Sequence, residues 1–189
     1  MKLKGRDKVG IFFIFILLAG CNKEYPNWKV EKIEELGMVF FYPPDFEIGD
    51  IDEIPIEHVP ISEGEKRIIF CNLQKCKFIY LTYENKANWV EGYHYETAAA
   101  TRKFFYENTS DSIKIIKENT IYINKNKFNR IQILSYSIIN NKSYCAMDIA
   151  GRTQNGYDVS IRYKVPVDGK NIDEIITESE NIIKKMYFY

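Results

Sequence analysis

The sequence is poor in the residues that most often build metal and catalytic centres. Its 189 residues include only two histidines, His58 and His94, and four cysteines. Zinc sites use several His or Cys ligands at short, regular spacings, and no such spacing occurs here. The Gly-x-Ser-x-Gly, P-loop and Gly-x-Gly-x-x-Gly motifs are also absent. We therefore expect no metal site and no cofactor, and an enzyme is the minority interpretation.

The chain also lacks an excess of charge of either sign. Its 26 Lys and Arg residues balance 26 Asp and Glu residues. A nucleic-acid-binding protein would show a clear basic excess, so we expect no nucleic-acid partner. The hydrophobic fraction of 46% and aromatic fraction of 15% instead predict a well-packed globular domain. The 14 Tyr and 12 Phe residues favour β structure.

The apolar run near the N-terminus is too short to cross a membrane. It extends from Val9 to Ala19, about 11 residues, whereas a membrane-spanning helix needs roughly 20. Four basic residues precede this run, as in a signal peptide. The sequence Leu18-Ala19-Gly20-Cys21 then resembles the lipobox of bacterial lipoproteins. In that motif, small residues precede the cysteine whose thiol receives a diacylglyceryl group.

This resemblance implies that Cys21 is lipidated and becomes the first residue of the mature protein. Residues 1–20 would be the signal peptide, 21–27 a polar tether and 28–189 a single domain. The protein is then expected at the cell envelope, held by acyl chains such as palmitate, with the outer membrane favoured over the inner. The sequence allows either the periplasmic or the surface face of that membrane. The alternative is an ordinary secretory signal, or an anchor helix, that contains a cysteine.

Lipidation of Cys21 leaves three cysteines in the exported domain, where an oxidising compartment permits pairing. Cys71 and Cys76 flank four turn residues between two β-rich runs. We predict that these runs form a hairpin and that a disulfide between Cys71 and Cys76 closes its loop. Cys145 shares a face with apolar residues and is predicted to be a buried, reduced thiol.

The hydrophobic pattern predicts a chain rich in strands. The expected strands are 38–42, 66–70, 77–83, 112–123, 128–139, 143–150 and 157–165. The first of these is apolar at every position, as in a central strand covered on both sides. Two helices are expected, one over 93–106 and one at the C-terminus. The second begins after Asn171, which can cap its first turn, and carries an apolar stripe at helical spacing.

The order of these elements predicts an α+β domain. We expect an α/β/α sandwich with a central antiparallel sheet and helices on both faces. Residues 40–46, Phe-Phe-Tyr-Pro-Pro-Asp-Phe, are similar to the F-x-Y-P-x-x-[WF] opening of the Mog1/PsbP-like fold. The resemblance would cover most of residues 30–189. It assigns no site, because that superfamily shares no catalytic motif. An NTF2-like cone is the alternative fold, although it normally opens with helices.

The segment 89–96 is the densest aromatic and titratable cluster outside a clear strand. Trp89, Tyr93 and Tyr95 could supply the large aromatic anchors of a binding patch, with His94 at the start of the predicted helix. The alternative is that the aromatic residues hold this helix on the sheet while His94 faces water.

The sequence thus predicts a lipid-anchored binding or accessory module with a protein of the cell envelope as its partner. The alternative is an envelope hydrolase that uses His94 or a pair of carboxylates as acid and base. A deep pocket with converging acids or histidine would favour the enzyme. A shallow surface with exposed apolar side chains would favour the binding module.

Overall fold

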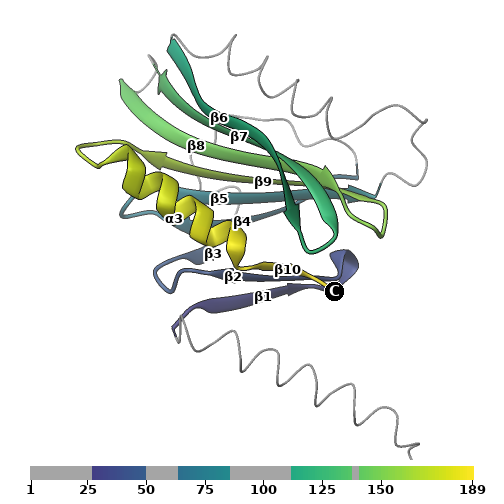
Figure 1. The fold of residues 1–189 in the computed structure, drawn as a ribbon. Coiled ribbons are helices and arrows are strands. Elements are labelled where there is room, and N and C mark those ends of the chain that lie inside the picture. The colour runs from purple at the N-terminus through teal and green to yellow at the C-terminus, as the bar shows by residue number, and fades with distance from the viewer. Residues whose placement is uncertain (1–26, 50–63, 86–111, 138–140) are drawn as a thin grey trace, which may run out of the picture.

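The computed structural model describes residues 27–49, 64–85, 112–137 and 141–189, and strands dominate these ranges (Figure 1). The strands are β1 (Lys29–Ile33), β2 (Met38–Tyr42), β3 (Glu47–Gly49), β4 (Lys66–Asn72), β5 (Lys77–Asn85), β6 (Ser112–Ile123), β7 (Asn126–Ser137), β8 (Lys142–Arg152), β9 (Tyr157–Pro166) and β10 (Met186–Phe188). The 3-10 helix η1 (Glu34–Leu36) follows β1, and the α-helix α3 (Ile172–Lys184) precedes β10.

The strands form two separate antiparallel sheets. The large sheet has seven strands in the order β3-β4-β5-β9-β8-β7-β6, and the small sheet has three in the order β1-β2-β10. Strand β9 shows how the sequence produces this arrangement. Its residues Val159, Ile161, Tyr163 and Val165 are buried on one face and alternate with polar residues.

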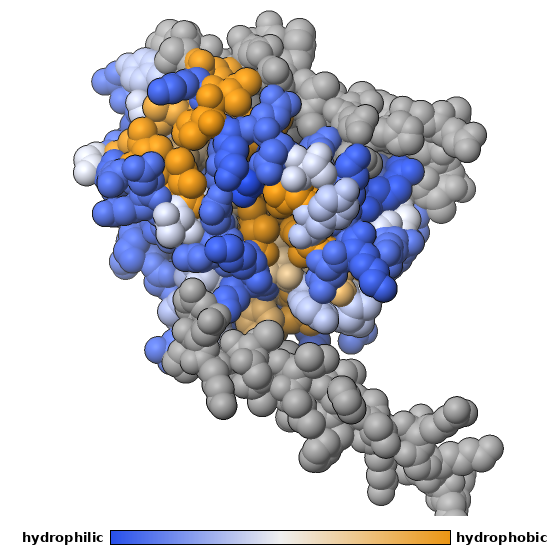
Figure 2. All heavy atoms as spheres, in the orientation of Figure 1, coloured by the Kyte–Doolittle hydropathy of each residue, from blue (hydrophilic) through white to orange (hydrophobic). Residues whose placement is uncertain are grey.

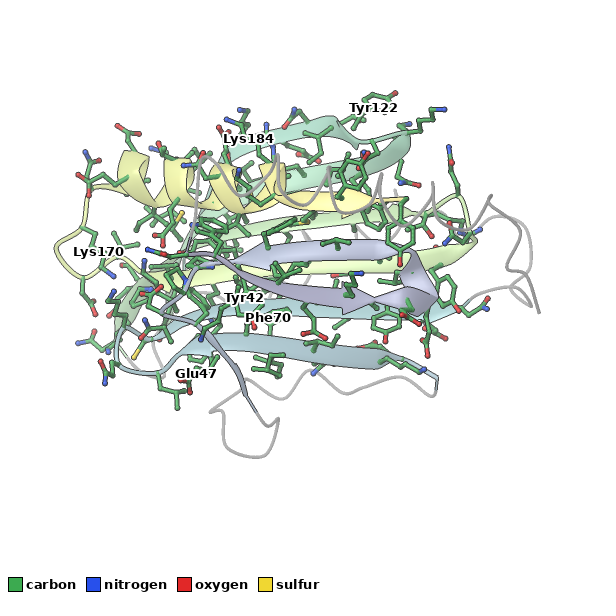
Figure 3. The ribbon with its side chains drawn as sticks, turned by 90° about the horizontal axis from the view of Figure 1, so that it is seen from below. Tyr42, Glu47, Phe70, Tyr122, Lys170 and Lys184 are labelled. Carbon is green, nitrogen blue, oxygen red and sulfur yellow. The ribbon has the colours of Figure 1, made fainter. Side chains whose placement is uncertain are left out.

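The small sheet packs against the large one through aromatic residues of β2. All five residues of β2 are buried, as the sequence predicted. The rings of Phe40 and Tyr42 lie 5.0 Å and 4.6 Å from the ring of Phe70 on β4. Figure 3 shows Tyr42 and Phe70 side by side. The predicted central strand is therefore the centre of the small sheet and has no place in the large one.

Helix α3 forms as the sequence predicted. The Asn171 side chain accepts a hydrogen bond from the backbone N–H of Asp173 at 3.0 Å and caps the first turn. The apolar stripe of the helix, represented by Ile175 and Ile182, is buried in the main core. This core lies between one face of the large sheet and a layer made of α3 and the small sheet (Figure 1).

The predicted α/β/α sandwich with helices on both faces is wrong. The described ranges contain one α-helix, and a three-stranded sheet lies beside it in the same layer. The prediction failed because it placed every strand in one sheet and did not foresee β10. The other helix that the sequence predicts, 93–106, lies outside the described residues. The NTF2-like alternative gains no support, since the described chain opens with strands β1 and β2.

No helix in the described part of the chain combines the length and the apolar character needed to cross a bilayer.

Candidate functional site

A groove of about 390 Å³ opens where the carboxyl half of α3, strand β10 and the end of β6 meet. We call it the tyrosine groove. It is lined by Ile121, Tyr122, Ile123, Asn124, Arg130, Glu180, Ile183, Lys184, Met186 and Tyr187. Figure 2 looks onto this side of the molecule and shows apolar surface between hydrophilic side chains.

The turn between β6 and β7 fixes one wall of the tyrosine groove. Asn124 has a φ of +53°, a backbone conformation that Asn tolerates better than most residues. Its side-chain oxygen accepts a hydrogen bond of 3.0 Å from the backbone N–H of Phe188 on β10. The rings of Phe128 and Phe188 stack behind it with centroids 5.6 Å apart. These contacts join elements about 60 residues apart in sequence into one rigid wall.

The groove has an apolar floor and two exposed tyrosines. Ile123, Ile183 and Met186 are buried and form the floor. Tyr122 is 70% exposed and Tyr187 is 43% exposed, and both residues line the groove. Exposed tyrosines offer a partner a large apolar surface together with a hydroxyl that can form a hydrogen bond. The arrangement is that of a binding surface.

Arg130 brings a buried positive charge to the groove. Only 8% of this residue is exposed. Its Nε donates to Oδ1 of Asn119 at 2.9 Å, and its Nη1 donates to Oε1 of Glu180 at 3.2 Å. The Nζ of Lys117 lies 3.3 Å from the same Glu180 oxygen. One carboxylate from α3 therefore pairs with two cations from the large sheet.

Gln132 is the next residue along β7 on the same face as Arg130. It is only 1% exposed, and neither its amide oxygen nor its amide nitrogen has a hydrogen-bond partner in the described structure. A buried polar group left unpaired costs about 1–3 kcal/mol. Such groups are rare in stable proteins and call for an explanation.

A second recess, of about 490 Å³, lies at the amino half of α3. We call it the Trp28 recess. It is lined by Trp28, Pro43, Asp173, Glu174, Thr177, Glu178 and Asn181. Glu178 accepts two hydrogen bonds from Nζ of Lys77, at 2.6 and 2.7 Å. Burial raises the pKa of the nearby Tyr163 hydroxyl, and the charge of Glu178 raises it further, so this phenol stays protonated.

Among the described residues, no histidine or cysteine lines either recess. Glu180 is the carboxylate that lines the tyrosine groove, and Asp173, Glu174 and Glu178 line the Trp28 recess. Burial raises the pKa of the Cys145 thiol to about 11, which makes it a poor nucleophile. Within the described ranges, no three His, Cys, Asp or Glu side chains are placed to hold a metal ion.

The predicted disulfide between Cys71 and Cys76 does not occur in the structure. The hairpin forms as predicted, but its register places Phe78 opposite Cys71. Cys76 instead closes the turn, its backbone N–H donating to the carbonyl of Leu73 at 3.2 Å. Cys71 is buried and Cys76 is exposed, so the two thiols face different surroundings.

The other predicted site residues lie outside the described residues. These are Cys21, Trp89, Tyr93, His94 and Tyr95. Sequence reasoning missed Arg130 and the two tyrosines of the groove, because they come from elements that only the fold brings together. The concentration of basic residues between positions 114 and 130 was the one signal that could have pointed to this region.

Comparison with known proteins gives the fold and little more. No protein-family model matches the sequence, and no curated protein matches it. The structure is similar to the solution structure of cyanobacterial PsbP (CyanoP) from Synechocystis sp. PCC 6803. The TM-score is 0.62 and the identity 9%, over 86% of this chain and 93% of that chain.

A protein of unknown function from Pseudomonas aeruginosa also matches, with a TM-score of 0.42 and 7% identity. This match covers 82% of this chain and 94% of that chain. The similarity to CyanoP is the informative one. The described chain therefore has a PsbP-like fold.

Proposed function

We propose that this protein is a lipid-anchored binding module of the cell envelope and that the tyrosine groove is its binding surface. The observation that carries the proposal is the composition of the groove. It combines a buried apolar floor, two exposed tyrosines and a buried arginine. The similarity of the fold to CyanoP is compatible with this role but does not specify it.

The dimensions of the groove suit binding. Its volume of about 390 Å³ falls within the range of 300–1,000 Å³ that is common for ligand pockets. Binding energy at protein interfaces is concentrated in a few large residues, among which Tyr and Arg are over-represented. Tyr122, Tyr187 and Arg130 supply both residue types around one apolar floor.

The expected lipid at Cys21 would orient the domain. Six residues lie between Cys21 and Trp28, and a fully extended chain over those seven steps spans at most about 25 Å. Trp28 lies at the amino half of α3, whereas the tyrosine groove lies at the carboxyl half. The lipid would hold the Trp28 end near the bilayer and leave the tyrosine groove directed at a partner.

Site-specific photo-crosslinking in cells tests the binding surface. Benzoylphenylalanine is placed at Tyr122 or Tyr187 and, as a control, at Leu73, which is 54% exposed in the turn between β4 and β5. We expect cross-linked products from positions 122 and 187 and none from position 73. Absence of products at both groove positions, or equal products at all three, would contradict the proposal.

The anchor needs its own test. Replacing Cys21 by Ser is expected to give an unprocessed or released protein, because lipidation with two or three acyl chains is what makes such anchoring stable. Membrane fractionation followed by mass spectrometry of the N-terminus measures the result. A Cys21→Ser variant that is cleaved and still remains with the membrane would disprove the lipid anchor and leave the groove in place.

A further inference from the structure

We infer that the tyrosine groove recognises a peptide segment in which a carboxylate stands beside a large apolar side chain. We further infer that Glu180 occupies the carboxylate position in the unbound protein. This inference rests on the proposed function and specifies the partner of the same surface. The carboxylate would pair with Arg130, and the apolar side chain would fill the floor formed by Ile123, Ile183 and Met186.

Arg130 is held in a geometry that suits a carboxylate. A guanidinium has five N–H donors in one plane, and it binds carboxylates through two parallel hydrogen bonds. Two donors of Arg130 are engaged, one by Asn119 and one by Glu180. The hydrogen bond from Nε to Asn119 does not involve Glu180 and would remain if another carboxylate took the place of Glu180. A ligand carboxylate that replaced Glu180 would meet donors already in position.

The surroundings of the groove are strongly basic, although the whole chain is neutral. Residues 112–137 and 180–189 together hold seven basic and two acidic residues. The basic residues are Lys114, Lys117, Lys125, Lys127, Arg130, Lys184 and Lys185, and the acidic ones are Glu118 and Glu180. Charge complementarity therefore favours an acidic partner, and it would also accelerate association at low salt. Figure 3 shows Lys184 and Tyr122 on the same side of the molecule.

Glu180 has the properties of a replaceable group. Its side chain is 31% exposed, and it contacts Arg130 and Lys117 through a single oxygen at 3.2 and 3.3 Å. Exchanging Glu180 for another carboxylate keeps a negative charge beside Arg130, so the exchange does not leave a buried charge unpaired. The intramolecular pair keeps the buried charge of Arg130 neutralised until a ligand arrives.

Gln132 is a second buried polar residue beside Arg130 on the same face of β7. It is 1% exposed and is not among the residues that line the groove, so its amide is not itself a ligand contact. The ligand contact of this face is Arg130, and a peptide has the carboxylate that can pair with it. A flat anionic bilayer would reach the exposed lysines but not Arg130, which is only 8% exposed.

The test uses the detergent-solubilised full chain and a set of fluorescent hexapeptides. Each peptide carries Asp or Glu beside Phe, Leu or Tyr, and each has a counterpart with Asn or Gln. Fluorescence anisotropy measures binding. We expect the amide counterparts to bind about tenfold more weakly, because a hydrogen bond to a charged group is lost. Vesicles of phosphatidylglycerol are measured in parallel.

Two variants and one control then identify the residues. Glu180→Gln is expected to tighten binding of the acidic peptides several-fold, because it removes the competing carboxylate. Glu174→Gln makes the same charge change at the other end of α3 and is expected to have no effect. Arg130→Lys keeps the charge but loses the planar pair of donors, and it should weaken binding about tenfold. Circular dichroism checks that each variant is folded.

Equal binding of acidic and amide peptides would overturn the inference, as would equal effects of Glu180→Gln and Glu174→Gln. Binding to the vesicles without binding to any peptide would also overturn it and would assign the basic surface to a membrane. In each of these cases, cross-links from positions 122 and 187 that are absent at Leu73 would show that the proposed function still holds. Loss of those cross-links as well would contradict both the further inference and the proposed function.

Discussion

The two ends of helix α3 carry opposite charges, and the helix dipole accounts for both. It does not account for the residues that the large sheet adds at the carboxyl end. The Trp28 recess has Asp173 and Glu174 at the amino end, and the tyrosine groove has Lys184 at the carboxyl end. Both placements stabilise the helix dipole. Arg130 and Tyr122 come from the large sheet, and Arg130 pairs with Glu180 of the helix at 3.2 Å. This difference is the reason for placing function at the carboxyl end.

The two ends also differ in how they are held, and the carboxyl end depends on burial. Ile182 is fully buried there, beside Ile183. Replacing Ile182 by Ala is expected to destabilise the domain by about 2–5 kcal/mol, since it removes buried methyl groups and leaves a cavity. Urea denaturation measures the effect. Ile176→Ala, at a partly exposed position of the same helix, should cost clearly less. Equal losses from the two variants would show that the carboxyl end is not the better packed one.

Replacing Gln132 is expected to raise the stability of the domain, whereas replacing Ile182 lowers it. Gln132→Met keeps the length of the side chain and removes two unpaired polar groups, so we expect a gain of about 1–3 kcal/mol in the free energy of unfolding. The same denaturation experiment measures it. A loss of stability would mean that the amide is hydrogen-bonded in solution.

The amino end of α3 depends on a polar cap. Asn171→Ala is expected to cost about 1 kcal/mol, because the backbone N–H of Asp173 loses its acceptor. Asn171→Ser should restore most of the stability, since Ser caps almost as well. Cross-links from the tyrosine groove should not change in either variant. If they disappeared, the two ends of the helix would be coupled, and the comparison between them would fail.

The smallest expected effect is one of pH. Burial acts to raise the pKa of Asp45, but the hydrogen bond from Lys75 and its charge outweigh it and lower that pKa below 3.8. A carboxyl whose pKa is lower in the folded state stabilises the fold above its unfolded pKa. This stabilisation is lost as the pH falls from about 4 through the folded pKa. Asp45→Asn should therefore reduce the difference in stability between pH 6 and pH 3. An unchanged difference would show that Asp45 is not a source of acid sensitivity.

Local patterns were sufficient to predict most of the elements. The alternation in β9 and the cap and stripe of α3 each arise from side chains a few residues apart. Strand β10 was not predicted because a segment of three residues is too short to show an alternation of apolar and polar side chains. Its strand conformation depends on pairing with β2, about 150 residues earlier in the chain. Long-range packing likewise decides which strands join the large sheet and which join the small one. The sequence pattern therefore predicted the strands but not their division between two sheets.

The tyrosine groove could not be predicted for the same reason. Its floor combines Ile123 with Ile183 and Met186, which are neighbours only after the β6–β7 turn docks on β10. Of its features, only the local excess of lysine and arginine is visible in the sequence. That excess was hidden in the whole-chain balance of 26 basic and 26 acidic residues.

The position of β10 has a consequence for how this protein folds. Strand β2 receives its second neighbour only from Met186 to Phe188, and Tyr189 then donates a backbone hydrogen bond to the carbonyl of Gly37. These contacts join residues about 150 positions apart, and closing so long a loop costs more entropy than forming a local hairpin. The small sheet is therefore expected to be completed later in folding than the hairpins of the large sheet.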